Sequence, residues 1–198
     1  PYIKGQCKKR GWTHVRAVKE NVDTFQPEGT FDRIVSVEMF EHMRNYAELF
    51  QRMSTWCKPD GLLFVHIFAH REVPYLFEAK DDADWMSRYF FGGGTMPSHE
   101  LLPSFDQEFE RIEDWRINGI HYSKTLEAWL KRLDARKPEA MSIMEQTYGA
   151  RDAALWFQRW RIFLMACSEL FAFDDGREWG VSHYRFAPGA MACAGAGP

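Results

Sequence analysis

The segment VSVEMFEHM brings three ionisable side chains within five positions, namely Glu38, Glu41 and His42. In a helical turn, positions i, i+3 and i+4 lie on one face, so the three side chains would point the same way. A carboxylate beside an imidazole is a common proton acceptor near neutral pH. The alternative is a charged first turn, in which the helix dipole favours the acids and His42 is solvated. The spacing alone leaves both interpretations open.

The element that must position these groups is a strand expected over residues 31–37, which ends just before Glu38. An amphipathic helix is expected over 46–57, a helix stop and turn over 58–61, and a second apolar strand over 62–68. Strand, helix, turn and strand form a βαβ unit, so we expect a parallel sheet covered on both faces. Ligands of such sheets bind outside the carboxyl ends of the strands, where the ionisable groups stand.

The rest of the chain alternates between helical and extended patterns without internal repeats. We expect the end of a helix over 3–10, a short strand over 13–18, a loop over 21–28, a strand over 109–118, helices over 123–135, 138–148 and 151–170, a turn over 174–176 and a strand over 179–186. Residues 74–98 are aromatic and acidic without a clean period, and the small-residue tail 187–198 is expected to be disordered.

Composition indicates an ordinary globular domain. Of the 198 residues, 45% are hydrophobic and 27% charged, and the net charge of −3 gives no reason to expect a nucleic-acid partner. The longest apolar run, 62–69, is too short to span a bilayer, so no membrane insertion is expected. The four cysteines (Cys7, Cys57, Cys167 and Cys193) are far apart, which favours reduced thiols in the cytoplasm over structural zinc. The 16% aromatic content fits either an aromatic core or a pocket for a flat or apolar substrate.

Two further features have competing interpretations. His66 lies inside the second apolar strand, where it is either a core histidine or part of a site with Glu38, Glu41 and His42. A metal site from these four residues matches no standard ligand spacing. The glycines of FGGGT, residues 91–95, neither follow a strand nor open a helix, so they predict a flexible turn and not a phosphate loop.

Five collinear segments between about Cys7 and Phe186 resemble one enzyme family. They are VSVEMFEHMRNY, LLFVHIF, DADWMSRYFFGGGTMPS, NGIHYSKTLEAWLKRLD and WRIFLMACSELF. Together they are similar to the S-adenosylmethionine-dependent methyltransferases that include cyclopropane-fatty-acyl-phospholipid synthases, mycolic acid cyclopropane synthases and plant coclaurine and pavine N-methyltransferases. EMFEHM and RYFFGGGTMPS look more like the coclaurine N-methyltransferase branch. The resemblance implies an α/β, Rossmann-like class I methyltransferase fold over 1–186, with mostly helical cap and substrate regions at 74–108 and 123–171.

The resemblance also implies roles for individual residues. In the N-methyltransferases the base pair falls on Glu41 and His42, supported by Glu38. In the cyclopropane synthases a bound bicarbonate is the base, held by residues that match Glu41, His66 and Tyr122. The remaining implied residues are those of the acyl or amine pocket, Trp160, Phe163 and Cys167, and those of the S-adenosyl-L-methionine site, Asn21, Val22 and Ser36. Asn21 stands where the family has an acidic residue near the adenine amino group.

The resemblance implies that part of the cofactor site is missing. The family's glycine-rich loop and ribose-binding acid lie upstream of the residue equivalent to Pro1, so we expect a truncated chain without the first strands. The methyl acceptor is either an amine or the double bond of an unsaturated acyl phospholipid. The rival hypotheses are a non-catalytic fragment that binds a substrate or partner but not the cofactor, and a nicotinamide-dependent enzyme, which the absent GxGxxG motif disfavours. The oligomeric state, a homodimer included, stays open.

Overall fold

The computed structural model describes residues 1–82, 84–105 and 107–189, in two compact units that divide between Thr30 and Phe31. In the first unit, helix α1 (Tyr2–Arg10) ends at Gly11, whose φ of 67° is left-handed and favours glycine. This helix and the loop over 21–28 confirm the predictions. The strand predicted over 13–18 is wrong, because these residues are largely exposed and no described strand pairs with them.

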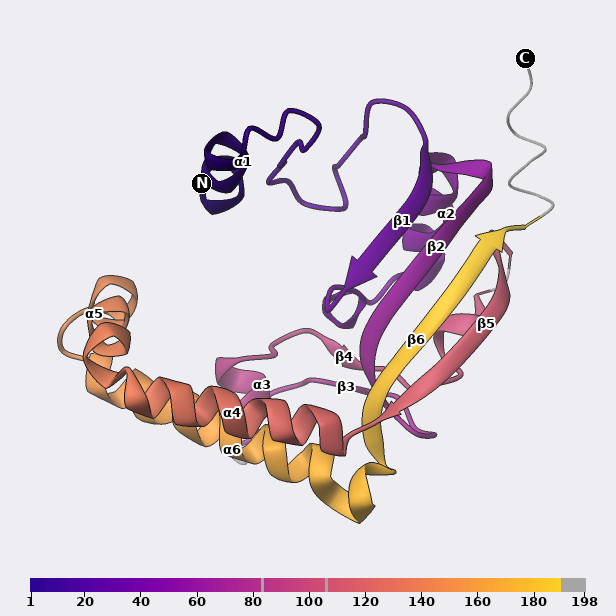
Figure 1. Cartoon of the computed structure of the whole chain (residues 1–198). Coiled ribbons are helices and arrows are strands. Elements are labelled where there is room, and N and C mark those ends of the chain that lie inside the picture. Colours follow the sequence, from indigo (N-terminus) through magenta and orange to yellow (C-terminus); the bar gives the residue numbers. More distant parts are fainter. Residues whose placement is uncertain (83, 106, 190–198) are drawn as a thin grey trace. The chain divides into compact units, whose positions relative to one another are not determined.

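The second unit is built on a four-stranded sheet in the order β1-β2-β6-β5 (Figure 1). Its strands are β1 (Phe31–Val37), β2 (Cys57–His70), β5 (Phe109–Asn118) and β6 (Trp179–Pro188). The pair β1–β2 is parallel as predicted, but β2–β6 and β6–β5 are antiparallel, so the predicted all-parallel sheet is wrong. The apolar pattern of a strand indicates burial, and it does not encode the direction of a distant neighbour.

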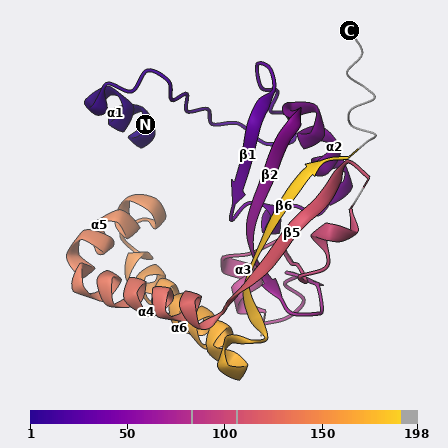
Figure 2. The same ribbon diagram turned by 45° about the vertical axis from the view of Figure 1, so that its right-hand side comes forward.

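One face of the sheet is covered by helix α2 (Tyr46–Trp56), which lies beside the strands in Figures 1 and 2. Phe50 of this helix contacts the rings of Phe109 and Phe186 at 5.8 and 5.5 Å between centroids. On the opposite face of β1, Val35 and Val37 are 64% and 56% exposed. Within the second unit this face of β1 is therefore exposed, in contrast to the predicted cover on both faces, whereas Phe68 of β2 packs against α4 and α6.

The predicted turn over 58–61 lies inside β2. Helix α2 ends at Trp56 and β2 begins at the next residue, with an irregularity between the pairs Phe31–Cys57 and Arg33–Leu62. A β-carbon at Gly61 would meet Cys57 Sγ at 2.6 Å and Lys58 O at 2.9 Å. The helix stop was therefore correctly predicted, but the residues after it form a bulge in a strand and not a separate turn.

Between β2 and β5 the chain forms short elements, and beyond β5 it forms long helices. The short ones are β3 (Tyr75–Leu76), α3 (Trp85–Tyr89), β4 (Thr95–Met96) and the 3-10 segment η2 (Leu102–Ser104), so the prediction that residues 74–108 are mostly helical is wrong. The glycine turn and the β3–β4 pairing compete with helix formation there. The long helices are α4 (Ile120–Ala135), α5 (Lys137–Tyr148) and α6 (Ala153–Gly176). Leu126 of α4 and Leu164, Cys167 and Phe171 of α6 share one apolar cluster.

The end of α6 contains the turn that the sequence predicts. Asp174 and Asp175 have φ angles of 50° and 53°, which interrupt the helix before Gly176. The chain then reverses into β6, which continues to Pro188. The prediction of a disordered tail from residue 187 is therefore wrong at its start, and residues 190–198, with Cys193, lie outside the described residues. No helix among the described residues is long and apolar enough to cross a membrane.

Candidate active site

A cavity of about 570 Å³ opens beyond the carboxyl end of β1. Glu38, Glu41 and His42 line it, together with Tyr122 from α4. Phe163 and Cys167 from α6 line it as well, so the structure brings six of the predicted site residues to one cavity. Besides Tyr122 and Phe163, the aromatic rings in its walls are Phe68, Tyr75, Phe77, Trp85, Phe91, Trp129 and Phe171. Part of the aromatic content of the chain therefore lines a pocket.

The backbone after β1 turns sharply to place these groups. Glu38 N still donates to His66 O at 3.1 Å, and its φ of 50° is in the left-handed region, which is rare for a residue other than glycine. The next residues form a 3-10 turn, η1 (Phe40–His42), and not the α-helical turn that would align all three side chains. Phe40 is fully buried against Tyr46 and Phe50, and this anchor fixes the residues on either side of it.

Glu41 has the electrostatics of a general base. It is only 2% exposed, and burial, followed by the negative charge of Glu38, raises the pKa of its carboxyl to about 7. Its Oε2 has no hydrogen-bond partner among the described residues. A carboxylate with a free lone pair and a pKa near neutrality can accept a proton from a bound molecule.

Glu38 connects Glu41 to its surroundings. Burial raises the pKa of Glu38, and His66, whose Nε2 lies 3.0 Å from Glu38 Oε1, opposes this. Tyr122 Oη donates to Glu38 Oε2 at 3.4 Å, and burial together with the charge of Glu38 raises the pKa of this phenol. Tyr122 therefore stays a neutral donor. His42 is more exposed, with Nε2 3.8 Å from Glu41 Oε1 and its ring stacked on Phe91.

His66 faces a different cavity from Glu41. It lines a space of about 340 Å³ together with His121, His183 and Tyr122. Glu38 and Tyr122 line both cavities, whereas Glu41 lines only the larger one. The three residues predicted to hold bicarbonate are therefore distributed over two cavities, with Glu38 between them.

The predicted pocket residues of α6 differ in position. Phe163 lines the large cavity and stacks on Phe90 at 4.3 Å between centroids. Trp160 does not line that cavity; it packs behind Phe90 and Phe163, and its Nε1 donates to Tyr148 Oη. Cys167 lines the cavity, and burial raises the pKa of its thiol to about 12. It therefore remains a neutral, apolar wall at physiological pH and not a nucleophile.

The predicted cofactor residues belong to two units of the chain. Ser36 lies in β1 and is buried, and its Oγ has no hydrogen-bond partner among the described residues. Asn21 and Val22 belong to the first unit, where Asn21 Oδ1 accepts from Asp23 N. Within the described part of the chain, no group of three or more His, Cys, Asp and Glu side chains could hold a metal ion.

The FGGGT segment forms the predicted turn, and the structure gives the reason for its glycines. The turn closes the β3–β4 pair, where Phe77 N donates to Gly94 O at 2.9 Å. A β-carbon at Gly94 would lie 2.8 Å from Glu41 O and 3.2 Å from Phe77 Cδ2. The sequence indicated flexibility, but here glycine also permits a close approach to the backbone of the candidate base.

Sequence reasoning missed His183 and Trp129. His183 lies on β6 and Trp129 on α4, and both line the smaller cavity. Trp129 also lines the large one. A lone histidine in a strand and a tryptophan on a helix are ordinary core residues, so neither carried a signal of its own in the sequence.

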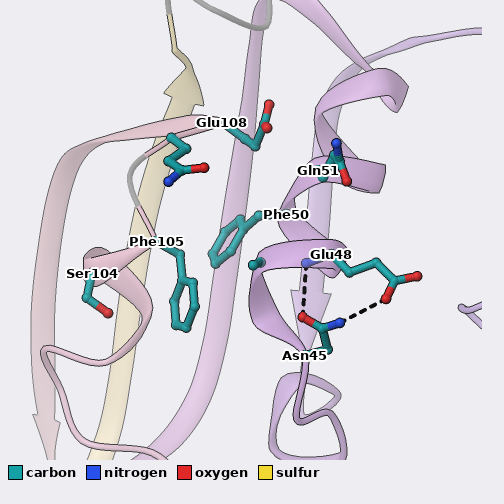
Figure 3. Close-up of a pocket in the computed structure, with 9 residues that line it drawn as sticks. Asn45, Glu48, Phe50, Gln51, Ser104, Phe105 and Glu108 are labelled. Atoms are coloured by element: carbon teal, nitrogen blue, oxygen red, sulfur yellow. Dashed lines mark hydrogen bonds between the residues drawn. The ribbon is translucent and has the colours of Figure 1, made fainter.

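A larger cavity, of about 740 Å³, lies between α2 and the segment before β5 (Figure 3). Its polar residues include Asn45, whose Oδ1 accepts from Glu48 N at 3.3 Å and caps α2. Phe50 and Phe105 stack within it. No histidine, cysteine or buried carboxylate is among its described lining residues, so its size alone does not make it the reactive site.

Comparison with known proteins relates this arrangement to a family. A family model described as mycolic acid cyclopropane synthetase matches residues 2–177. (S)-coclaurine N-methyltransferase of Papaver somniferum is 38% identical over 188 residues, which cover 93% of this chain and 54% of the relative. The cyclopropane-fatty-acyl-phospholipid synthase of Escherichia coli K12 is 31% identical over 76% of this chain and 37% of its own length. The matched part of the chain thus spans about half the length of the first relative and less than half the length of the second.

Solved structures agree with the sequence matches. The crystal structure of coclaurine N-methyltransferase bound to N-methylheliamine and SAH has a TM-score of 0.87 at 34% identity, covering 94% of this chain and 55% of the other. A cyclopropane synthase from Mycobacterium tuberculosis has a TM-score of 0.68 at 21% identity, covering 93% of this chain and 67% of the other, which shows a common fold. These structures confirm the α/β fold class expected from the sequence.

Proposed function

The chain belongs to the mycolic acid cyclopropane synthetase family, and on that premise we propose that it acts in methyl transfer from S-adenosyl-L-methionine to an amine. The observation that carries this proposal is the buried carboxylate of Glu41, with a pKa of about 7, in an aromatic cavity. The similarity to coclaurine N-methyltransferase supports an amine acceptor.

The described residues fit one part of a cofactor site. Ser36 Oγ is a buried hydroxyl near the carboxyl end of β1, without a hydrogen-bond partner among the described residues, and it could bond a polar group of the cofactor. Asn21 and Val22, in the first unit, are proposed as further cofactor residues on the family resemblance. When bound, S-adenosyl-L-methionine supplies a methyl group on a positively charged sulfur.

The chain's own residues would prepare the amine for attack. A protonated amine is attracted by the faces of aromatic rings such as Phe91 and Phe163, which line the cavity. Glu41 Oε2 accepts the N–H proton, so that the nitrogen lone pair becomes the nucleophile. Tyr122 and His66 hold the neighbouring Glu38, and the aromatic walls exclude water and fix the direction of attack. The net result would be one new N–CH₃ bond in place of the donor's methyl–sulfur bond, whose electron pair stays on the now neutral sulfur, and one proton on Glu41.

A second acceptor, the double bond of an unsaturated acyl phospholipid, is supported by the apolar wall around Cys167 and by an adjoining groove. This groove, of about 410 Å³, lies among α4, α5 and α6 and shares Trp129 with the large cavity. In that case bicarbonate would be the base that removes the final proton, held by Tyr122 with Glu41 or His66. The groove has room for the remote part of a chain.

The setting that we propose for this reaction is the cytoplasm. Cys7, Cys57 and Cys167 are free and buried, as expected where thiols stay reduced. We propose no nucleic-acid partner, because the net charge is only −3, and no stable membrane insertion, because the longest apolar run, 62–69, is too short to span a bilayer. A homodimer is compatible with this proposal and is decided by light scattering.

The test joins this chain to the part of the Papaver somniferum enzyme that it does not match. Methyl transfer from labelled S-adenosyl-L-methionine is then measured with coclaurine and with vesicles of unsaturated phospholipid. We expect methylated coclaurine, and less of it with Glu41→Gln. Transfer to lipid alone would favour the second acceptor, and transfer to neither would overturn the proposal.

A calorimetric titration of the 198-residue chain itself with S-adenosyl-L-methionine addresses the rival hypothesis of a non-catalytic fragment. We expect stoichiometric binding that weakens in Ser36→Ala, because this variant lacks the buried hydroxyl that would bond the cofactor. If titration of the chain alone releases no heat of binding but the joined protein binds, the remaining cofactor contacts would lie in the part taken from the Papaver somniferum enzyme. Absence of binding in both would support the non-catalytic fragment.

A further inference from the structure

His183 on β6 forms the end of a line of three side chains. It pairs across the sheet with His66 of β2, and His66 Nδ1 lies 2.8 Å from His183 Nε2. The other nitrogen of His66, Nε2, lies 3.0 Å from Glu38 Oε1. The rings of Trp115 and Phe64 contact His183 at 5.1 and 5.3 Å between centroids and hold it in the sheet. The line runs from the smaller cavity to the carboxylate beside the candidate base.

The proton positions along this line are not independent. A neutral imidazole carries one N–H, and an ionised carboxylate only accepts. Glu38 Oε1 is buried and has no hydrogen-bond partner of good geometry among the described residues, so its 3.0 Å approach to His66 Nε2 is an ion-pair contact. An ionised Glu38 repels a lone pair on that nitrogen, which favours the N–H of His66 on Nε2 and leaves Nδ1 as an acceptor. His183 must then donate from Nε2, and its Nδ1 bears no hydrogen. His183 Nδ1 is buried and has no hydrogen-bond partner among the described residues. This agrees with the assignment, in which Nδ1 carries a lone pair and no hydrogen.

We propose that His183 is a positioning residue, whose Nε2–H holds His66 in the tautomer that carries its own N–H on Nε2, facing the carboxylate of Glu38. The imidazole of His183 is suited to this task when it is neutral, and burial, with His66 nearby, lowers its pKa. The ionisable groups that share the cavity with the pair are Glu38, from the segment after β1, and His121 and Tyr122, from α4.

The consequence for catalysis rests on the proposed function. Without the donor at residue 183, His66 is free to place its Nε2 lone pair toward Glu38, and Glu38 then takes up a proton. The charge of Glu38 is one cause of the raised pKa of Glu41, so its loss makes Glu41 a weaker base. The effect of His183 on the reaction thus passes through His66 and Glu38, without contact with the substrate.

The experiment that tests the proposal is nitrogen NMR on the 198-residue chain with ¹⁵N-labelled histidine. Long-range ¹H–¹⁵N spectra report the tautomer of each ring. We expect the Nε2–H tautomer for His66 in the wild type and in His183→Gln, whose amide can still donate, and the other tautomer or a mixture in His183→Leu. His121→Gln, in the same cavity, serves as the control and should leave His66 unchanged. An Nδ1–H tautomer of His66 in the wild type overturns the proposal even if the leucine variant fails to fold.

A second measurement uses the joined protein. We expect kcat/KM at pH 7 to fall about tenfold in His183→Leu, with its acid limb displaced to lower pH, and both to recover in His183→Gln. A purely structural role would lower activity without displacing the pH profile, and that result would contradict the proposal. If the joined protein is inactive with every substrate, the proposed function fails, while the NMR spectra still decide the tautomer.

Discussion

Two imidazole–carboxylate pairs in this molecule have nearly the same nitrogen–oxygen distance but different surroundings. His66 lies 3.0 Å from Glu38, and His99 lies 2.8 Å from Asp114. His99 Nδ1 is also 2.9 Å from Ser182 Oγ, so the second cluster has the residue types of a serine hydrolase triad. Ser182, however, is fully buried, and the cluster lines none of the cavities described above.

The difference between the two clusters lies in access and in unused hydrogen-bonding capacity. Both ring nitrogens of His99 are occupied, and its backbone oxygen accepts from Tyr184 Oη at 2.8 Å. In the first cluster, Glu41 keeps an oxygen without a partner among the described residues, beside a cavity that admits a ligand. Reactive residue types at hydrogen-bond distance therefore do not define a site unless one lone pair remains free and reachable.

The largest expected effect comes from Glu41→Gln, which replaces the basic carboxylate by an amide of nearly the same shape that cannot take up the proton. We expect methyl transfer in the joined protein to fall by about 10²–10⁴-fold, as for loss of a general base. We call the cluster of His99, Asp114 and Ser182 the closed cluster and that of His66, Glu38 and Glu41 the open cluster. Asp114→Asn is the matched control in the closed cluster and should leave kcat unchanged. Equal losses in both variants would show that the distinction between the clusters is wrong.

The next effect is on the pH dependence of stability. The pKa of Glu41 is raised from 4.5 to about 7, so the folded chain binds more protons than the unfolded chain between these values. The free energy of unfolding should therefore fall as pH rises from 4.5 to 7, by up to about 3 kcal/mol. Urea denaturation across this range measures it. The fall should be much smaller in Glu41→Gln, where only Glu38 keeps a raised pKa, and persist in full in Asp114→Asn. A fall of the same size in both variants would contradict the assignment.

The closed cluster should contribute to stability and not to activity. His99→Leu leaves Ser182 Oγ and the Asp114 carboxylate without their partner, and we expect the free energy of unfolding to decrease by about 2 kcal/mol. Methyl transfer at saturating substrate should stay at the wild-type level. A loss of activity larger than the loss of folded protein would mean that the cluster takes part in the reaction.

The comparison also shows how far the sequence could lead. Strands β1 and β5 have the bounds that were predicted from the sequence, 31–37 and 109–118. These bounds could be predicted because the apolar pattern of an extended segment is a local signal. The placement of Glu38, Glu41 and His42 beside a cavity followed from the end of a strand. In contrast, the pairing of His66 with His183 depends on the register of β2 with β6, and the closed cluster depends on that of β5 with β6. No local period encodes such registers, so neither the His66–His183 contact nor the cluster of His99, Asp114 and Ser182 could be predicted.

The smallest effect that we predict concerns the glycine turn against the open cluster. In Gly94→Ala the new methyl group would lie 2.8 Å from Glu41 O, so the backbone of the base must shift by a few tenths of an ångström. We expect a loss of about 1 kcal/mol in the free energy of unfolding, together with a fall of a few-fold in methyl transfer, since overpacking displaces Glu41. Gly92→Ala is the control, because its methyl group would meet Ser87 O at 3.2 Å and not the base. If both variants lower activity equally, the turn acts through its flexibility; if only Gly94→Ala does, the close approach to Glu41 is what the glycine preserves.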